Sequence, residues 1–340
     1  MSICCDIMTE FLDSCYDAIK VQETSIAETI KSVDVSGVSQ FKDKKRIVLI
    51  GAGDSYAVSE FGKWAFLAAG LNAYSLSPID IMHIPLDTHS VVIGVTASGR
   101  SLSTLEALQK AESRGASIIV LTDNPEGKAT NESSSHWVTK AGVDSYNVSP
   151  ASPTTTAMVY LLTLAAQLDG PIQKDLQNDL NQLTRIGKPM LRWAEDEGIA
   201  ISKHLSLRPS LYLISDGPNY VAAEIGMMKL NEFGVIKGFA AQREEFCHHQ
   251  NLSVDDNDEA ILVTGIKQPD DEHYMHILTD VLKMKAYHLY VEDDLSLRTS
   301  LAQTIPNTIA LQMTAHHIVR KYRPDMEWFK MPHAKAFKIY

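Results

Sequence analysis

The sequence is poor in cysteine, and it lacks long apolar runs. Four cysteines occur in 340 residues, and none forms a C-x-x-C pair, so we expect neither a disulfide scaffold nor a cysteine-bound metal. No apolar run approaches the roughly 20 residues that a membrane helix needs. The first residues include Asp6, Glu10 and Asp13 and lack the basic and apolar pattern of a signal peptide. These absences favour a cytoplasmic chain that does not enter a membrane.

Positive charge is also scarce, because 31 lysines and arginines face 42 aspartates and glutamates, for a formal net charge of −11. This balance excludes a non-specific binder of nucleic acid or of an anionic membrane. It does not exclude a small phosphorylated ligand, because a local group of hydrogen-bond donors can bind an anion on an acidic protein.

Two common cofactor signatures are missing as well. The turn G-A-G-D-S at residues 51–55 lacks the third glycine of a dinucleotide fingerprint, since Tyr56 stands at that position. No H-E-x-x-H or similar spacing indicates a metal site. We therefore expect no cofactor and no metal.

Apolar strands alternate with helical patterns along the chain. Residues 5–32 are helical in pattern, with apolar positions that include Ile7, Phe11, Ile19 and Ile26. Strands are then expected over 47–50, 71–77, 91–95, 117–122 and 136–139, and helices between them and over 154–168. Near-continuous apolar strands that alternate with helices predict an α/β fold with a doubly wound parallel sheet.

The chain then repeats itself at a constant offset of 164 residues. Residues 211–234 align without gaps on residues 47–70, and three of the matched pairs are Gly53 with Gly217, Tyr56 with Tyr220, and Gly70 with Gly234. A match of that length predicts two copies of one α/β fold. A more polar helical stretch, 169–203, separates the two copies.

The first copy contains a loop rich in hydroxyls, V-T-A-S-G-R-S-L-S-T at residues 95–104, between a strand and a helix. Thr96, Ser98, Ser101 and Thr104 offer hydroxyl groups, and Gly99 allows close approach of the backbone. Together with the helix N-terminus, they predict a phosphate site. The second copy has I-K-Q-P-D-D in the corresponding place, so we expect the anion site in the first copy alone.

A second cluster of reactive side chains lies in the second copy. Lys229 and Glu232 are three residues apart on a predicted helix, and Glu245 and His248 follow on a stretch predicted to be non-helical. A glutamate can serve as a general base, and a histidine can protonate a ring oxygen near neutral pH. The alternative is that Lys229 and Glu232 form an ordinary surface pair worth a few tenths of a kcal/mol.

Together these features resemble the SIS (sugar isomerase) domain family, in particular its amidotransferase, deaminase and deglycase branches. The resemblance extends from about Lys45 to Tyr340. It implies two SIS domains in tandem, each a flavodoxin-like three-layer αβα sandwich. The expected parts are an N-terminal helical segment (1–45), a phosphate-binding domain (46–168), a helical linker (169–203), a domain with the acid–base residues (204–325) and a tail over the site (326–340).

The resemblance also implies which residues hold the substrate. The family's phosphate loop falls on Thr96, Ala97, Ser98, Gly99 and Ser101. Its earlier turn falls on Gly53, Asp54 and Ser55, where Asp54 replaces a neutral residue and would read a sugar hydroxyl or an amine. Further contacts to the sugar are expected from Val148, Ser149 and Glu245.

The implied catalytic residues are Lys229, Glu232, His248 and Lys335. Glu232 would move a proton between C1 and C2, Lys229 would hold that carboxylate or a sugar oxygen, and Lys335 would lie on the closing tail. His248 would open the sugar ring and, in the family, commonly reaches in from the other subunit, which implies a homodimer. His249 and Gln250 depart from the family's H-G-P pattern, so His249 is an alternative acid.

The resemblance therefore implies an enzyme for an amino-substituted hexose 6-phosphate that releases ammonia or an amine, as a glucosamine-6-phosphate deaminase does. A deglycase for Amadori-type fructosamine 6-phosphates and a plain aldose–ketose isomerase are the alternatives within this class. The alternative of another class is a phosphosugar-binding sensor without catalysis.

Overall fold

The computed structural model describes residues 3–131, 133, 135–143, 151–206, 210–291, 295–329, 337 and 339. It divides into two compact units. The first-sheet unit comprises Val21–Gly187 and Met331–Tyr340, and the second-sheet unit comprises Met1–Lys20 and Lys188–Lys330. The helical segment predicted over 1–45 is thus divided, with its first helix grouped with the second sheet.

The first-sheet unit is built on five parallel strands in the order β2-β1-β3-β4-β5. This is the flavodoxin-like order, and it confirms the predicted fold class. The strands are β1 (Arg46–Ile50), β2 (Ala73–Leu76), β3 (Ser90–Val95), β4 (Ser117–Thr122) and β5 (His136–Val138). The helices are α2 (Gln22–Ser32), α3 (Asp54–Ala68), α4 (Leu102–Ser113), α5 (Lys128–Asn131), α6 (Ser152–Ala165) and α7 (Gln173–Leu183), with 3₁₀ turns η1 (Val35–Phe41) and η2 (Pro78–His83).

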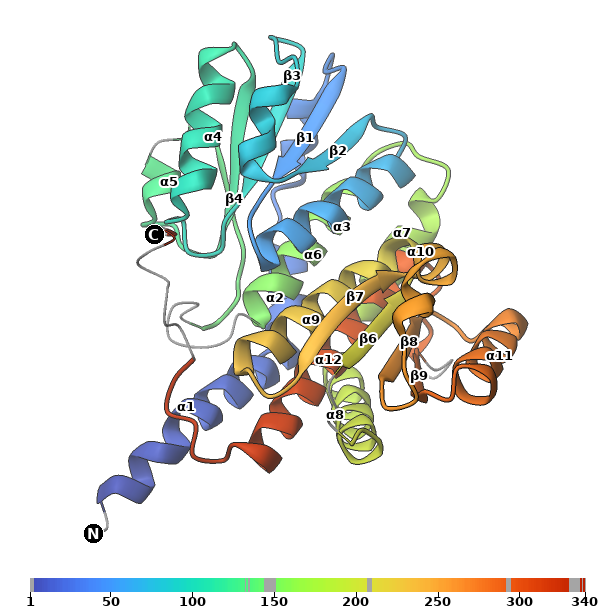
Figure 1. The fold of residues 1–340 in the computed structure, drawn as a ribbon. Coiled ribbons are helices and arrows are strands. Elements are labelled where there is room, and N and C mark those ends of the chain that lie inside the picture. The colour runs from blue at the N-terminus through green and yellow to red at the C-terminus, as the bar shows by residue number, and fades with distance from the viewer. Residues whose placement is uncertain are drawn as a thin grey trace. The chain divides into compact units, whose positions relative to one another are not determined.

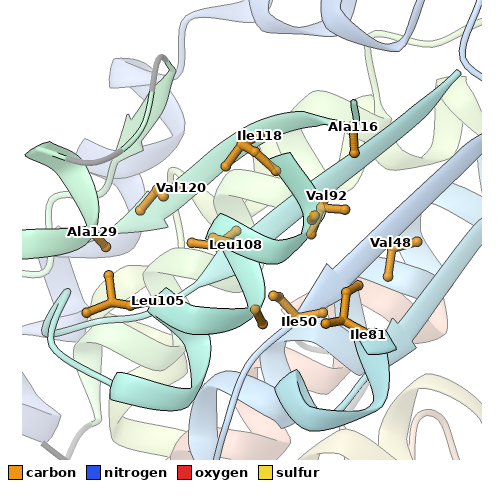
Figure 2. Close-up of a cluster of buried hydrophobic side chains, with 12 residues drawn as sticks. Val48, Ile50, Ile81, Val92, Leu105, Leu108, Ala116, Ile118, Val120 and Ala129 are labelled. Atoms are coloured by element: carbon orange, nitrogen blue, oxygen red, sulfur yellow. The ribbon is translucent and has the colours of Figure 1, made fainter. Parts of the chain in front are cut away.

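A buried apolar cluster fixes α4 against this sheet (Figure 2). Leu105 and Leu108 on the inner face of α4 pack with Val92 of β3 and Val120 of β4. Gly94 allows this approach, because a Cβ there would lie 2.8 Å from a methyl carbon of Leu108. Tight packing of this kind holds the N-terminus of α4 at one position above the sheet.

The second-sheet unit has four parallel strands in the order β7-β6-β8-β9. This order repeats that of the first four strands of the first sheet, so the sequence repeat corresponds to a repeated fold. The strands are β6 (Ser210–Ser215), β7 (Lys237–Gln242), β8 (Glu259–Thr264) and β9 (Lys285–Tyr290). The helices are α1 (Ile3–Lys20), α8 (Gly187–His204), α9 (Tyr220–Phe233), α10 (Arg243–His248), α11 (Pro269–His276) and α12 (Ser300–Tyr322), with short turns η3 (Gly217–Asn219), η4 (Gln250–Ser253) and η5 (Ile277–Val281).

A long buried helix, α12, packs against α9 and α1 in this unit (Figure 1). Its His316 donates from Nε2 to the carbonyl of Leu12 at 3.0 Å and stacks on Tyr16, with ring centroids 5.0 Å apart. Tyr16 in turn donates a hydrogen bond to Glu195 of α8. These contacts explain why α1 belongs to the second sheet although it comes first in the sequence. Within the part of the chain described, no helix combines the length and apolar character that crossing a membrane requires.

Candidate active site

The predicted phosphate loop lies between β3 and α4, at the carboxyl edge of the first sheet. Its backbone carbonyls are turned toward the segment that follows β4: Thr122 Oγ1 donates to Ala97 O and Asn124 Nδ2 donates to Ser98 O, both at 3.0 Å. The amide of Ala129 donates to Gly99 O, also at 3.0 Å. Three successive carbonyls are therefore occupied by the protein itself, which fixes the course of the loop.

Two glycines allow this close arrangement. Gly99 has a φ of +68°, and a Cβ on it would lie 2.9 Å from the Cα of Gly127. A side chain at this position would therefore meet both backbone strain and a steric clash. The glycine predicted to permit close approach is required here by the neighbouring backbone.

Hydroxyl groups gather where α4 begins. Ser101 is the N-cap residue, yet its side chain makes no capping bond. Its oxygen instead lies 3.1 Å from Thr104 Oγ1 and 3.3 Å from Ser103 Oγ. The first backbone amides of a helix have no partner within the helix. The start of α4 therefore offers both hydroxyl and backbone N–H donors to an anion. One of these amides, that of Leu102, donates to Ile339 O at 3.3 Å.

The turn after β1 lies beside this loop. β1 and β3 are neighbouring strands, and the chain crosses over in opposite directions from them, which makes their carboxyl ends the place where open α/β sheets bind ligands. Gly53 has a φ of +59°, and Asp54 and Ser55 form the first turn of α3. The structure thus brings Ser55, Gly53 and Asp54 to the same edge as Ser98 and Ser101, whereas Thr96 is buried beneath the loop.

The predicted acid–base pair is present on α9 of the second-sheet unit. Lys229 Nζ lies 3.1 Å and 3.0 Å from the two carboxylate oxygens of Glu232. Lys229 is 1% exposed, while the side chain of Glu232 is 34% exposed. The surface-pair alternative is therefore wrong for the lysine: its ammonium is buried and needs a negative partner. A partly exposed carboxylate that a buried ammonium holds in place can face a ligand.

Two exposed histidines lie at the end of α10: His248 is its last residue, and His249 follows it. His248 Nε2 lies 2.9 Å from Glu244 Oε1, and His249 Nε2 lies 3.4 Å from Glu245 Oε2. The prediction of a non-helical stretch here is wrong, because Arg243–His248 forms a helix. The four-residue spacing of a helix is what creates both pairs.

Glu232 and His248 lie at opposite edges of the second sheet. α9 runs back to the start of β7, so Glu232 is at the amino edge, whereas α10 follows the carboxyl end of β7 (Figure 1). β7 has six residues, which span about 20 Å at 3.3 Å per residue. One chain therefore does not bring this histidine to its own Glu232.

Three predicted residues, Val148, Ser149 and Lys335, lie outside the described residues. The phosphate loop and the Lys229–Glu232 pair belong to different units. Within the described ranges, no three histidine, cysteine, aspartate or glutamate side chains are grouped so as to hold a metal ion.

The burial of Lys229 was missed from the sequence, although a signal was available. The repeat aligns Lys229 with Ala65 of α3, and Ala65 is fully buried. The shared position on the two helices indicates an inward face. Comparing the two copies residue by residue would have distinguished the buried lysine from a surface lysine.

Comparison with known proteins assigns the first-sheet unit: the SIS domain family model matches residues 40–167. A glutamine–fructose-6-phosphate aminotransferase (isomerizing) of Aquifex aeolicus is 26% identical over 271 residues, which cover 78% of this chain and 45% of that protein. The chain spans about half, or less, of the length of the curated relatives that it matches first.

Solved structures share the fold over most of the chain. The C-terminal domain of glucosamine-fructose-6-phosphate aminotransferase from Francisella tularensis has a TM-score of 0.74 at 20% identity. The match covers 90% of this chain and 95% of that domain's chain. Glucosamine-6-phosphate deaminase from Thermotoga maritima has a TM-score of 0.69 at 14% identity, with coverage of 91% and 95%. The chain thus carries a SIS domain, and its second sheet continues the fold of these proteins.

Proposed function

We propose that this SIS-domain chain is a phosphosugar enzyme that acts on an amino-substituted hexose 6-phosphate and releases ammonia or an amine. The observation that carries the proposal is the Lys229–Glu232 pair, a buried ammonium that orients a partly exposed carboxylate. A protein that only senses phosphosugars needs the phosphate loop but not this pair. The names of the relatives and neighbours, which concern fructose 6-phosphate and glucosamine 6-phosphate, support the same class of substrate.

In the proposed reaction, the loop at 96–101 and Ser55 hold the phosphate. This remote group contributes binding energy that positions C1 and C2. In the open-chain amino aldose, Glu232 takes the proton from C2, and the electron pair passes into the C1 carbonyl to give an enolamine. The proton returns to C1, which leaves an imine at C2. Water adds to C2 of the imine, and the C2–N bond then breaks, which releases ammonia and leaves a ketone at C2.

Ring opening requires an acid, and we assign it to His248 of the partner subunit. Within one chain, His248 follows the carboxyl end of β7 and Glu232 precedes its start, so a second copy is the source that allows both residues to act on one sugar. The proposal therefore includes a homodimer. His249, paired with Glu245 on the same helix, is the alternative acid.

The test compares Glu232→Gln with the exposed control Glu28→Gln on α2. The wild-type chain is assayed against hexose 6-phosphates, glucosamine 6-phosphate and fructosamine-type 6-phosphates, with free ammonia and free amine measured separately. We expect Glu232→Gln to lower kcat by about 10² to 10⁴, the usual contribution of a general base, and Glu28→Gln to leave it unchanged.

Each other outcome has a defined meaning. Ammonia release identifies a deaminase, amine release a deglycase, and interconversion without release an isomerase. Turnover by Glu232→Gln at the wild-type rate contradicts the mechanism. Binding of phosphosugars by the wild-type chain without any turnover across the panel contradicts the enzyme and favours a sensor.

A further inference from the structure

A second cleft opens in the second-sheet unit, with a volume of about 460 Å³. It lies between the carboxyl ends of β6 and β8. Its lining includes Asp216, Pro218 and Asn219 after β6, and Thr264, Gly265, Ile266 and Gln268 at and after the end of β8. β6 and β8 are the neighbouring strands from which the chain crosses over in opposite directions. The cleft therefore occupies the place in the second copy that the phosphate loop occupies in the first.

Two buried amides face this cleft. Asn219 and Gln303 both line it, and each is only 4% exposed. Asn219 Oδ1 accepts from Asn307 at 2.8 Å, and Gln303 Nε2 donates to Leu297 O at 2.8 Å. No hydrogen bond among the described residues engages Asn219 Nδ2 or Gln303 Oε1. A donor and an acceptor on two largely buried side chains are thus available to a ligand in the cleft.

Gly265 keeps the space between these two amides open. A Cβ on Gly265 would overlap Gln303 Oε1 and would lie 3.4 Å from Asn219 Nδ2. The free donor and the free acceptor therefore lie over the same backbone carbon. A hydroxyl group can donate to one and accept from the other, whereas a phosphate oxygen can only accept.

The charges of the lining also argue against phosphate. Two arginines and three aspartates line the cleft, for a formal charge of −1. Arg243 is already paired with Asp271 at 2.8 Å and packs over the ring of Tyr274 at 4.4 Å. Burial lowers the pKa of the neighbouring His288 to about 4, so this imidazole is neutral at pH 7 and adds no positive charge.

We propose that this cleft binds an unphosphorylated sugar, and an amino sugar in preference to a neutral one. The paired free amides read a hydroxyl group, and the excess of carboxylates favours an ammonium group over a phosphate. Its volume falls within the range usual for small-molecule sites, about 300 to 1,000 Å³. The site is separate from the phosphate loop and does not depend on the proposed reaction.

The experiment is calorimetric titration of the full chain with glucose, glucosamine and glucosamine 6-phosphate. Glucosamine is titrated both alone and with glucosamine 6-phosphate present to occupy the phosphate loop. The variant Asn219→Ala removes the donor without adding a charge, and Asn307 keeps its hydrogen bond to Thr264 O. Asn181→Ala, at an exposed position of α7, is the matched control. Gly265→Ala is the second variant, and circular dichroism verifies that each chain is folded.

We expect glucosamine to bind more tightly than glucose and to retain its affinity when the phosphate loop is occupied. Asn219→Ala and Gly265→Ala should each weaken glucosamine binding at least tenfold, whereas Asn181→Ala and the double variant Ser98→Ala/Ser101→Ala should not. Loss of glucosamine binding in the serine variant but not in Asn219→Ala would place the sugar at the phosphate loop and overturn the proposal. Tighter binding of glucosamine 6-phosphate at the Asn219-dependent site, or no binding of any of the three, would overturn it as well.

Discussion

The two sheets of this protein share their strand order but differ in what lies at their carboxyl edges. The first sheet ends in a loop of small hydroxyl residues at the start of α4, whose carbonyls are occupied by Thr122, Asn124 and Ala129. The second sheet ends in a cleft lined by arginines, aspartates and buried amides. One backbone arrangement thus offers hydroxyl and amide donors in one copy and mixed charges in the other.

A repeated fold supplies a place for a ligand, while the side chains decide which ligand it is. The second copy also carries a charged pair at the amino edge of its sheet. Lys229 and Glu232 lie at the end of α9, where the equivalent residues of α3 are Ala65 and Ala68. The charged side chains of the second copy therefore lie at both edges of its sheet, whereas the hydroxyl loop and the turn of the first copy lie at one edge.

The largest effect is expected from Lys229→Met, which tests whether the Lys229–Glu232 pair at the amino edge of the second sheet is catalytic. Methionine fills the space of the buried lysine stem, and the remaining Glu232 is partly exposed and can be solvated, so stability should change little. Turnover should fall by about 10² or more, because the carboxylate loses the group that orients it. The matched control is Ala65→Met in α3, which tests the packing effect of a long side chain at the equivalent position. Loss of folding in Lys229→Met, measured by thermal melting, would instead indicate a structural pair.

Mild acid should lower the stability of the second-sheet unit more than that of the first-sheet unit. Burial lowers the pKa of His288 and of His316 to about 4, and it also lowers the pKa of His317. Since the pKa in the unfolded chain is about 6.5, the unfolded state binds more protons between pH 6.5 and 4. Stability is therefore lost as the pH falls through this window, by up to about 3 kcal/mol for each of His288 and His316. All three histidines belong to the second-sheet unit.

Hydrogen exchange at pH 7 and pH 5 measures this difference. The peptides of α12 and β9 should exchange faster at pH 5 relative to those of β3 and β4, after correction for the intrinsic rates. His316→Gln should reduce the pH dependence, and the exposed control His136→Gln should not. Equal acid sensitivity of the two sheets would contradict the assignment.

The smallest effect is expected from a pair of glycine substitutions, one in each copy. Gly217 has a φ of +51° with nothing within 4 Å of an added Cβ, whereas Gly99 has a φ of +68° and a Cβ contact of 2.9 Å to Gly127. Gly217→Ala should cost about 1 kcal/mol from backbone strain alone, and Gly99→Ala about 2 kcal/mol or more. Thermal melting of the two variants provides the comparison. A smaller loss for Gly99→Ala would show that the loop can move away from Gly127.

Much of the fold could be predicted from local patterns. The strand predicted over 117–122 has those bounds in the structure, and the strand predicted over 91–95 begins one residue earlier. Both are continuous apolar runs, because strands of a parallel sheet are covered on both faces. The helix over Arg243–His248 was not predicted, since it is short and polar and is stabilised by its neighbours, including the Arg243–Asp271 ion pair.

Local sequence patterns are enough to predict the repeated α/β fold, the glycine-containing hydroxyl loop and the three-residue spacing of Lys229 and Glu232. These follow from apolar periodicity, from turn chemistry and from the pitch of a helix, all of which act over a few residues. Three further features are visible in the tertiary structure alone. Lys229 is buried, α1 packs with the second sheet, and the side chains of Asn219 and Gln303 both lie close to Gly265. Asn219 and Gln303 are 84 residues apart in sequence. Burial and contact at such separations depend on how the helices pack, which no local pattern records.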